Sequence, residues 1–257
     1  MNIKNKRILL TGGAGFIGST LAEKLIKENE ILIYDNFSRD SLSNKKIRSK
    51  NLKIIKDDIL NYDSLRNQCE DFKPQIVVHL AAIAGIDTVI KKPNKTLDVN
   101  INGTLNLLKA LEKYSDRLER LLDFSTSEVL GAYAYKSNEK SNTNFAPVGE
   151  GRWTYSISKV AGEHFVHSYY KQHGYPVVTV RPFNIYGPGQ VGEGAIQIFI
   201  KNVVMKKNIE IHGDGDQIRS WCYIDDMTDG IEKCLTNKKA VGEIINIGNP
   251  KGTITIS

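Results

Sequence analysis

A tyrosine and a lysine, Tyr155 and Lys159, stand four residues apart at the start of a predicted helix. This spacing places both side chains on one face of the helix, one turn apart. A lysine ammonium near a phenol favours the phenolate and lowers the pKa of the tyrosine. Such a phenolate can take a proton from an alcohol while the alcohol carbon gives hydride to a nicotinamide cofactor. The alternative is an exposed pair without function, which helices also contain by chance.

A run of hydroxyl and carboxyl groups, Ser125-Thr126-Ser127-Glu128, follows the predicted strand 120–124. Ligands of open parallel sheets bind at the carboxyl ends of the strands. A carboxylate at that edge can act as a base, although Glu128 could also cap a helix or pair with a lysine. The run therefore belongs with Tyr155 and Lys159 at a predicted catalytic centre.

A glycine-rich turn stands near the N-terminus. Gly12, Gly15 and Gly18 follow the apolar run 8–10, and an amphipathic pattern begins after them. Glycine lets the backbone double back and lets a helix N-terminus approach a pyrophosphate. Asp35, at the end of the predicted strand 31–34, can accept hydrogen bonds from ribose hydroxyls and repels a 2′-phosphate. The pattern predicts NAD rather than NADP, although Arg39 could weaken that preference.

Alternating strands and helices are expected to position these residues. Strands are predicted over 8–10, 31–34, 52–56, 75–80, 120–124 and 176–180, and helices over 62–70, 96–112 and from 153 through 169. The strand 75–80 is apolar throughout, as in a parallel strand covered on both faces. The pattern predicts an α/β fold with a Rossmann-type, doubly wound parallel sheet.

The strict alternation ends after about Asn184. Helices are predicted over 195–205 and 226–235, and short strands over 210–212, 221–224 and 243–247. We therefore expect an NAD-binding domain over 1–184 and a smaller, mixed substrate-binding lobe over 185–257. The lobe is expected to be truncated at its C-terminal end.

Composition places limits on the class of protein. The 257 residues are 40% hydrophobic and 25% charged, which is ordinary for a soluble globular chain. The net charge of +6 comes from scattered lysines without interleaved aromatic residues, so we expect no nucleic-acid partner. The three cysteines have no metal-binding spacing, so we expect neither a metal site nor disulfides. With no signal peptide or transmembrane run, we expect a cytoplasmic protein without a membrane partner.

Nine stretches of the sequence together resemble one family, the extended short-chain dehydrogenases/reductases that act as nucleotide-sugar epimerases and dehydratases. The matching stretches are Thr11–Gly18, Asp35-Asn36, Asp58-Ile59, His79–Ala82, Asn100, Ser125–Gly131, Tyr155 with Lys159, Arg181–Asn184, and Arg219–Asp226. The resemblance implies bound NAD, a nucleoside-diphosphate sugar as substrate, with a UDP-sugar favoured, and a homodimer.

The resemblance completes the set of predicted site residues. The predicted catalytic residues are Ser125, Thr126, Glu128, Tyr155 and Lys159. The predicted cofactor-binding residues are Gly12, Gly15, Phe16, Ile17, Gly18, Asp35, Asn36, Asp58, Ile59, Leu80, Ala81, Ala82, Asn100, Tyr155, Lys159 and Phe183. The predicted substrate-binding residues are Ser127, Asn184 and Arg219, of which the last two would meet the diphosphate.

Members of this family commonly oxidise the sugar at C4 to a 4-keto intermediate, and Glu128 indicates how that intermediate reacts next. Dehydratases and glucuronate decarboxylases usually carry Glu at this position, whereas simple 4-epimerases usually lack an acid. Ser127 departs from dTDP-glucose dehydratases, which have Asp there, and Leu130 replaces a usual Tyr. The sequence therefore favours a nucleotide-sugar dehydratase, with a 4-epimerase or a UDP-glucuronate decarboxylase as alternatives. An NADP-dependent carbonyl reductase and an NAD-sensing regulator are further alternatives, which Asp35 and the intact Tyr155–Lys159 pair disfavour.

Overall fold

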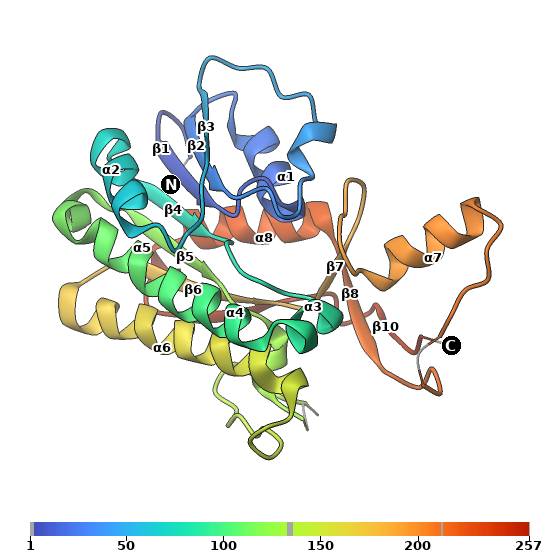
Figure 1. The fold of residues 1–257 in the computed structure, drawn as a ribbon. Coiled ribbons are helices and arrows are strands. Elements are labelled where there is room, and N and C mark those ends of the chain that lie inside the picture. Colours follow the sequence, from blue (N-terminus) through green and yellow to red (C-terminus); the bar gives the residue numbers. More distant parts are fainter. Residues whose placement is uncertain (1–2, 133–135, 212, 257) are drawn as a thin grey trace.

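The computed structural model describes residues 3–132, 136–211 and 213–256. Its centre is a sheet of seven strands in the order β3-β2-β1-β4-β5-β6-β9, in which every neighbouring pair is parallel (Figure 1). The strands are β1 (Arg7–Thr11), β2 (Glu30–Asp35), β3 (Leu52–Lys56), β4 (Ile76–His79), β5 (Arg120–Phe124), β6 (Val177–Pro182) and β9 (Ile244–Ile247). All six strands predicted before residue 184 are present, which confirms the doubly wound α/β fold.

Helices cover both faces of this sheet (Figure 1). The helices α1 (Phe16–Leu25) and α8 (Ile224–Thr236) pack on one face, and α2 (Tyr62–Phe72), α5 (Gly103–Leu111) and α6 (Thr154–His173) pack on the other. Successive strand residues point to opposite faces. Leu10 accordingly joins the core under α1 and α8, whereas Leu9 joins the core under α2, α5 and α6.

The prediction of one continuous α-helix over 96–112 is wrong. The segment consists of α4 (Pro93–Leu97), a π-helical stretch (Asp98–Asn102) and α5. Within the π stretch, Asn100 turns its side chain to the loop after β4, where its Oδ1 accepts from the Ile83 amide at 2.8 Å. Single π turns recur at functional sites, and the contact that explains this one is distant in sequence.

A smaller mixed sheet of three strands lies beside the large one, as predicted (Figure 1). In it β8 (Arg219–Tyr223) pairs in parallel with β7 (Asn184–Tyr186) and antiparallel with β10 (Thr253–Ile254). The strand predicted over 210–212 is not formed at Glu210 and Ile211, and His212 lies outside the described residues. The predicted helix 195–205 is α7 (Ala195–Val204), which extends away from the large sheet.

The large sheet uses residues from both sides of the predicted division at 184. Strand β9 pairs with β6, and α8 packs against the apolar core on one face of the large sheet. The division into domains at residue 184 therefore stays a prediction. The remaining helical segments are short: α3 (Ile86–Lys91) and the 3-10 turns Leu42–Asn44, Glu112–Arg117, Ser127–Leu130, Gly151–Trp153 and Lys238–Ala240.

Candidate active site

The glycine-rich turn joins β1 to α1 and fits the chain around it closely. Gly12 has φ +69°, and a Cβ there would lie 2.5 Å from the Ala81 amide nitrogen. A Cβ on Gly18 would lie 2.6 Å from Cα of Gly13. Gly15 differs, because its Cβ would meet only the Gly12 carbonyl oxygen, at 3.3 Å. Gly15 thus leaves open space at the N-terminus of α1, which suits the approach of a pyrophosphate.

Asp35 ends β2 beside this turn. Its carboxylate accepts from the Ala14 amide at 2.9 Å and from the Phe37 amide at 2.6 Å. Burial raises the pKa of Asp35 above its usual value, while these amides lower it. The backbone thereby fixes the carboxylate next to the glycine turn, where its remaining lone pairs could accept from ribose hydroxyls.

The structure brings Asp58 and Asn36 together beyond Asp35. The Asn36 side chain donates to Asp58 Oδ2 at 3.2 Å, and Asp58 Oδ1 accepts from the Leu60 amide at 3.0 Å. The N-cap of α2 is Asn61, whose Oδ1 accepts from the Ser64 amide. Ile59 is a buried core residue packed on Gly103, so only its backbone is available to a ligand.

The loop after β4 carries Leu80, Ala81 and Ala82, and Asn100 fastens it. Nδ2 of Asn100 donates to the Ile83 carbonyl at 3.1 Å and to Ser158 Oγ at 2.9 Å. Ser158 in turn donates to the Tyr155 carbonyl at 2.6 Å. Asn100 therefore links the predicted cofactor loop to the first turn of α6, and its side chain is engaged within the protein.

The Tyr155 hydroxyl lies beside Thr126 rather than Ser125. Burial and the charge of Glu128 raise the pKa of Tyr155 above its usual value, contrary to the predicted lowering, and a side-chain hydrogen bond with Thr126 opposes this shift. Ser125 is buried and donates from Oγ to Glu163 Oε1 at 2.6 Å, away from Tyr155. Both hydroxyls were predicted to be catalytic, and only that of Thr126 is next to the phenol.

The helical spacing predicts that Lys159 lowers the pKa of Tyr155. The groups that lower it most are instead Thr126 and Arg39. The buried Lys159 side chain instead interacts most strongly with Asp123 and Glu163. Burial lowers the pKa of Lys159, and the two carboxylates raise it.

Glu128 lies close enough to Tyr155 to act on its pKa, in the 3-10 turn that follows β5. Its Oε2 accepts from Ser156 Oγ at 3.3 Å, and its charge interacts with Tyr155, Arg152 and Arg219. Partial burial of the carboxyl group raises the pKa of Glu128, while Ser156 and the two arginines lower it. The residue as a whole is exposed, so a ligand can reach it.

The small sheet brings its predicted residues toward this centre. Arg219 begins β8 close enough to interact with the charge of Glu128, and Asn184 begins β7 beside Trp221 of β8. Phe183 donates its amide to the Ile247 carbonyl at 2.9 Å, and its ring packs on Gly248. Ser127 lies next to Glu128 in the 3-10 turn, and Phe16 and Ile17 begin α1.

An ion pair across the site was not predicted. Nη2 of Arg39, after β2, donates to the Ala84 carbonyl at 2.7 Å and to Glu193 Oε1 at 3.3 Å. Glu193 also accepts from the Asp87 amide at 3.1 Å. Three loops are thus joined, and Arg39 is engaged away from Asp35. A sequence gives no signal for this contact, because its partners are far apart along the chain.

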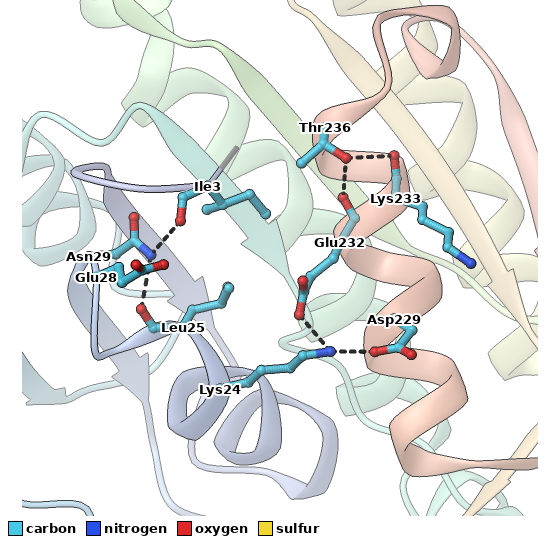
Figure 2. Close-up of a pocket in the computed structure, with 9 residues that line it drawn as sticks. All are labelled: Ile3, Lys24, Leu25, Glu28, Asn29, Asp229, Glu232, Lys233 and Thr236. Carbon is cyan, nitrogen blue, oxygen red and sulfur yellow. Dashed lines mark hydrogen bonds and ion pairs between the residues drawn. The ribbon is translucent and has the colours of Figure 1, made fainter. Parts of the chain in front are cut away.

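A cavity of about 440 Å³ lies elsewhere, between α1 and α8 (Figure 2). It is lined by Ile3, Lys24, Leu25, Glu28, Asn29, Asp229, Glu232, Lys233 and Thr236. Figure 2 shows Lys24 reaching across it to Asp229 and Glu232. None of the predicted site residues lines this cavity, and Lys24 and its two acidic partners satisfy one another.

Residues 8–248 match the model of the NAD dependent epimerase/dehydratase family. The chain belongs to this family. This match confirms the family predicted from the sequence, and it confirms NAD as the cofactor. Among the described residues, no helix combines the length and apolarity of a membrane span.

Relatives within the family differ in their reactions. The chain is 36% identical to dTDP-D-glucose 4,6-dehydratase of Dictyostelium discoideum, over 95% of this chain and 58% of that protein. It is also 36% identical to UDP-N-acetyl-alpha-D-glucosaminuronate decarboxylase of Bacillus cytotoxicus, over 95% of this chain and 75% of that protein. The structure of UDP-glucuronic acid 4-epimerase from Bacillus cereus, with UDP-glucuronic acid and NAD, superposes with a TM-score of 0.85. That comparison covers 97% of this chain and 79% of the epimerase at 34% identity.

Proposed function

We propose that this chain modifies a nucleoside-diphosphate sugar through transient oxidation at C4, and that the reaction is a dehydration. The observation that carries the proposal is a second acid–base group at the tyrosine centre. Glu128 interacts with the charge of both Tyr155 and Arg219. A simple alcohol oxidation needs one proton acceptor, whereas an elimination from the oxidised sugar needs another.

The cofactor is proposed to lie along the glycine turn, with its pyrophosphate over Gly15 and its adenosine ribose at Asp35. Asn36, Asp58 and the backbone of Ile59 would surround the adenine, and the loop 80–82 with Phe183 would line the nicotinamide half. When bound, NAD accepts hydride from C4 of the sugar and returns it later in the reaction.

Tyr155 is proposed as the base that takes the proton of the C4 hydroxyl. Thr126 would orient that hydroxyl, since it lies at the Tyr155 oxygen. Lys159 would supply the positive charge beneath the phenolate. Ser125, which donates to Glu163, would act on the site indirectly by holding the middle of α6.

Glu128 is proposed to act after C4 has become a ketone, which acidifies the proton on C5. Its carboxylate removes the C5 proton, the electrons of that bond form the C5–C6 double bond, and the C6 hydroxyl departs. The same carboxyl group, now protonated, passes its proton to the departing hydroxyl, so that water leaves. Ser127 stands where dTDP-glucose dehydratases have an acid, and this leaves both proton transfers to Glu128.

Arg219 and Asn184 are proposed to hold the diphosphate of the substrate, with Ser127 near the sugar. A guanidinium pairs with phosphate oxygens through two parallel hydrogen bonds. We favour a UDP-sugar because the Bacillus decarboxylase and epimerase named above act on UDP-linked substrates.

Decarboxylation of a UDP-linked uronate, or 4-epimerisation, is the second candidate, and Ser127 favours it. A 4-keto uronate loses carbon dioxide without an acid at C6, so a serine at position 127 is no obstacle there. The 36% identity to the Bacillus decarboxylase equals that to the Dictyostelium dehydratase.

The deciding experiment incubates the full-length natural protein with UDP-, dTDP- and GDP-hexoses and UDP-glucuronate, without reductant, and measures product masses. Loss of water supports the proposal. Loss of carbon dioxide, or an isomer of unchanged mass, replaces it with the second candidate. Stoichiometric consumption of NADPH would indicate a carbonyl reductase, and NAD binding without turnover of any sugar would indicate a sensor.

A further inference from the structure

Four polar residues form a buried row across the large sheet. Thr11, His79, Asp123 and Thr179 are neighbours in the registers of β1, β4, β5 and β6. The residues two positions earlier in these strands belong to the apolar core under α5 and α6, so the row lies on that same face. It stands one step closer to the carboxyl edge, directly below the catalytic centre.

Helix α6 covers this face and contributes a second polar row (Figure 1). Lys159, Glu163 and His167 follow Tyr155 at steps of four residues, which keeps them on one side of the helix. Lys159 and Glu163 are buried, and His167 is half-buried with Nε2 3.3 Å from Thr179 Oγ1. The two rows therefore face each other between helix and sheet.

Glu163 already has a partner of opposite charge. Arg181 donates to it from Nε at 2.8 Å and from Nη2 at 2.7 Å, and both side chains are buried. Ser125 also donates to the Glu163 carboxylate, at 2.6 Å. Arg181 thus already balances the charge of Glu163 at hydrogen-bond distance, although Glu163 still acts on Lys159.

His79 does not supply a charge either. Its ring nitrogens contact Thr11 Oγ1 at 2.7 Å and Thr104 Oγ1 at 3.0 Å. Burial, together with Lys159, lowers the pKa of His79 to about 3, so the ring is neutral. Among the described groups of the two rows, Asp123 is the acid left to balance Lys159.

We propose that Asp123 is the counter-ion of Lys159, a positioning residue that keeps the buried ammonium charged beneath Tyr155. This inference rests on the proposed function, which gives Lys159 its task. Asp123 is buried in β5, and its Oδ2 accepts from Thr179 Oγ1 at 3.3 Å. No described hydrogen bond joins it to Lys159, so the two buried groups attract each other by charge through the protein interior, where charges are weakly screened.

The charged groups that face Asp123 determine how this pair responds to pH. They are Lys159, Glu163 and His167 from α6, His79 from β4, Arg181 from β6, and Tyr155 above. Burial raises the pKa of Asp123 to about 6, and the charge of Lys159 opposes this shift. The counter-charge is therefore present at pH 8 and absent at pH 5.

A double-mutant cycle on protein stability tests the pair without any substrate. The variants are Asp123→Asn, Lys159→Met and the double variant, and the unfolding equilibrium constant is measured by denaturant titration at pH 8 and pH 5. Lys159→Met is expected to raise the unfolding constant by one factor in the parent and by another in the Asp123→Asn background. At pH 8 we expect the ratio of the first factor to the second to be at least about ten. At pH 5 we expect this ratio to approach one, because Asp123 is protonated.

An equal effect of Lys159→Met in both backgrounds at pH 8 would overturn the inference, as would a coupling that is unchanged at pH 5, since packing alone would explain it. Asp123→Ser replaces Asp123→Asn if the latter does not fold. Thr179→Val is the matched control, because it removes the hydrogen bond to Asp123 and keeps the charge.

The kinetic counterpart separates this inference from the proposed function. If the protein converts a nucleotide sugar, Asp123→Asn should shift the alkaline limit of kcat to lower pH, and Thr179→Val should not. If no sugar is converted, the proposed function fails, while the stability cycle still decides the role of Asp123.

Discussion

At the scale of single residues, the proposed function assigns one proton transfer to Tyr155 and a second to Glu128. Tyr155 lies at the Thr126 hydroxyl, and Glu128 interacts with Ser156 and Arg219. A substitution can remove the acid–base group of either residue with little change in side-chain volume, so the two proposed roles can be tested separately.

Tyr155→Phe should lower kcat by roughly 10²- to 10⁴-fold, the range of general acid–base catalysis, because the proton acceptor is lost. NAD affinity should change little. Turnover with the best substrate of the panel and NAD binding by calorimetry are the measurements. Tyr169→Phe is the control, because it removes a hydroxyl of the same helix that donates to Glu112 at 3.0 Å on the surface. A Tyr155→Phe variant with parental turnover would remove Tyr155 from the mechanism.

Glu128→Gln should uncouple oxidation from elimination. The amide cannot remove the C5 proton, whereas Tyr155 still accepts the proton of the C4 hydroxyl. We expect the absorbance of reduced nicotinamide to appear on mixing with substrate and to persist, with no loss of water in the product. Glu150→Gln, on the approach to α6, should behave like the parent. Full dehydration by Glu128→Gln would contradict the proposed mechanism.

At the scale of elements, the turn between β1 and α1 can be probed with one methyl group. Gly15→Ala should leave the fold intact, since its Cβ would meet only the Gly12 carbonyl oxygen at 3.3 Å. NAD affinity should fall about tenfold or more, because the methyl group occupies the surface proposed for the pyrophosphate. Equilibrium binding of NAD and the melting temperature are measured together. Gly151→Ala, whose Cβ would meet nothing within 4 Å, is the matched control. Unchanged NAD affinity in Gly15→Ala would contradict the proposed position of the pyrophosphate.

The elements themselves show how far sequence patterns reach. Most strands of the large sheet could be predicted because they are short, largely apolar runs that end at polar residues, and the same reasoning identified Asp35 and the glycine turn. The π stretch at Asn100, strand β7 and the Arg39–Glu193 pair could not. Each of these depends on a partner remote in sequence, and local propensity carries no record of it.

The predicted catalytic hydroxyls illustrate the same limit within one motif. Ser125 and Thr126 are adjacent and chemically similar, so a motif alone assigns both to the site. The strand alternation turns Ser125 to the core, where it donates a hydrogen bond to Glu163, and leaves Thr126 at Tyr155. Only the pairing of β5 under α6 separates the two roles.

At the scale of the whole molecule, the buried polar layer under α6 links stability to pH. The pKa of Asp123 rises from 3.8 to about 6 on folding, so the folded protein holds this proton more tightly than the unfolded chain. The free energy of unfolding therefore falls as pH rises through this window, by up to roughly 3 kcal/mol. Asp123→Asn should lack that slope. Denaturant titrations of both proteins from pH 4 to pH 7 measure the difference, and parallel pH profiles would show that Asp123 does not titrate there.

The predicted homodimer also belongs to this scale and stays a prediction. Light scattering of the full-length protein measures the molar mass directly.

The place of β9 in the sheet has a consequence for how the polypeptide is made. The chain leaves the large sheet at Pro182 and returns to it at Ile244, after passing through the small sheet, α7 and α8. During synthesis, β1 to β6 can pair while later residues are still inside the ribosome, but the outer edge of β6 then has no neighbour. An open strand edge next to Arg181 and the catalytic layer invites pairing with other nascent chains. Completion of the large sheet thus waits for the synthesis of β9, and a ribosome that stalls within α7 would release a product with this edge exposed to chaperones and proteases.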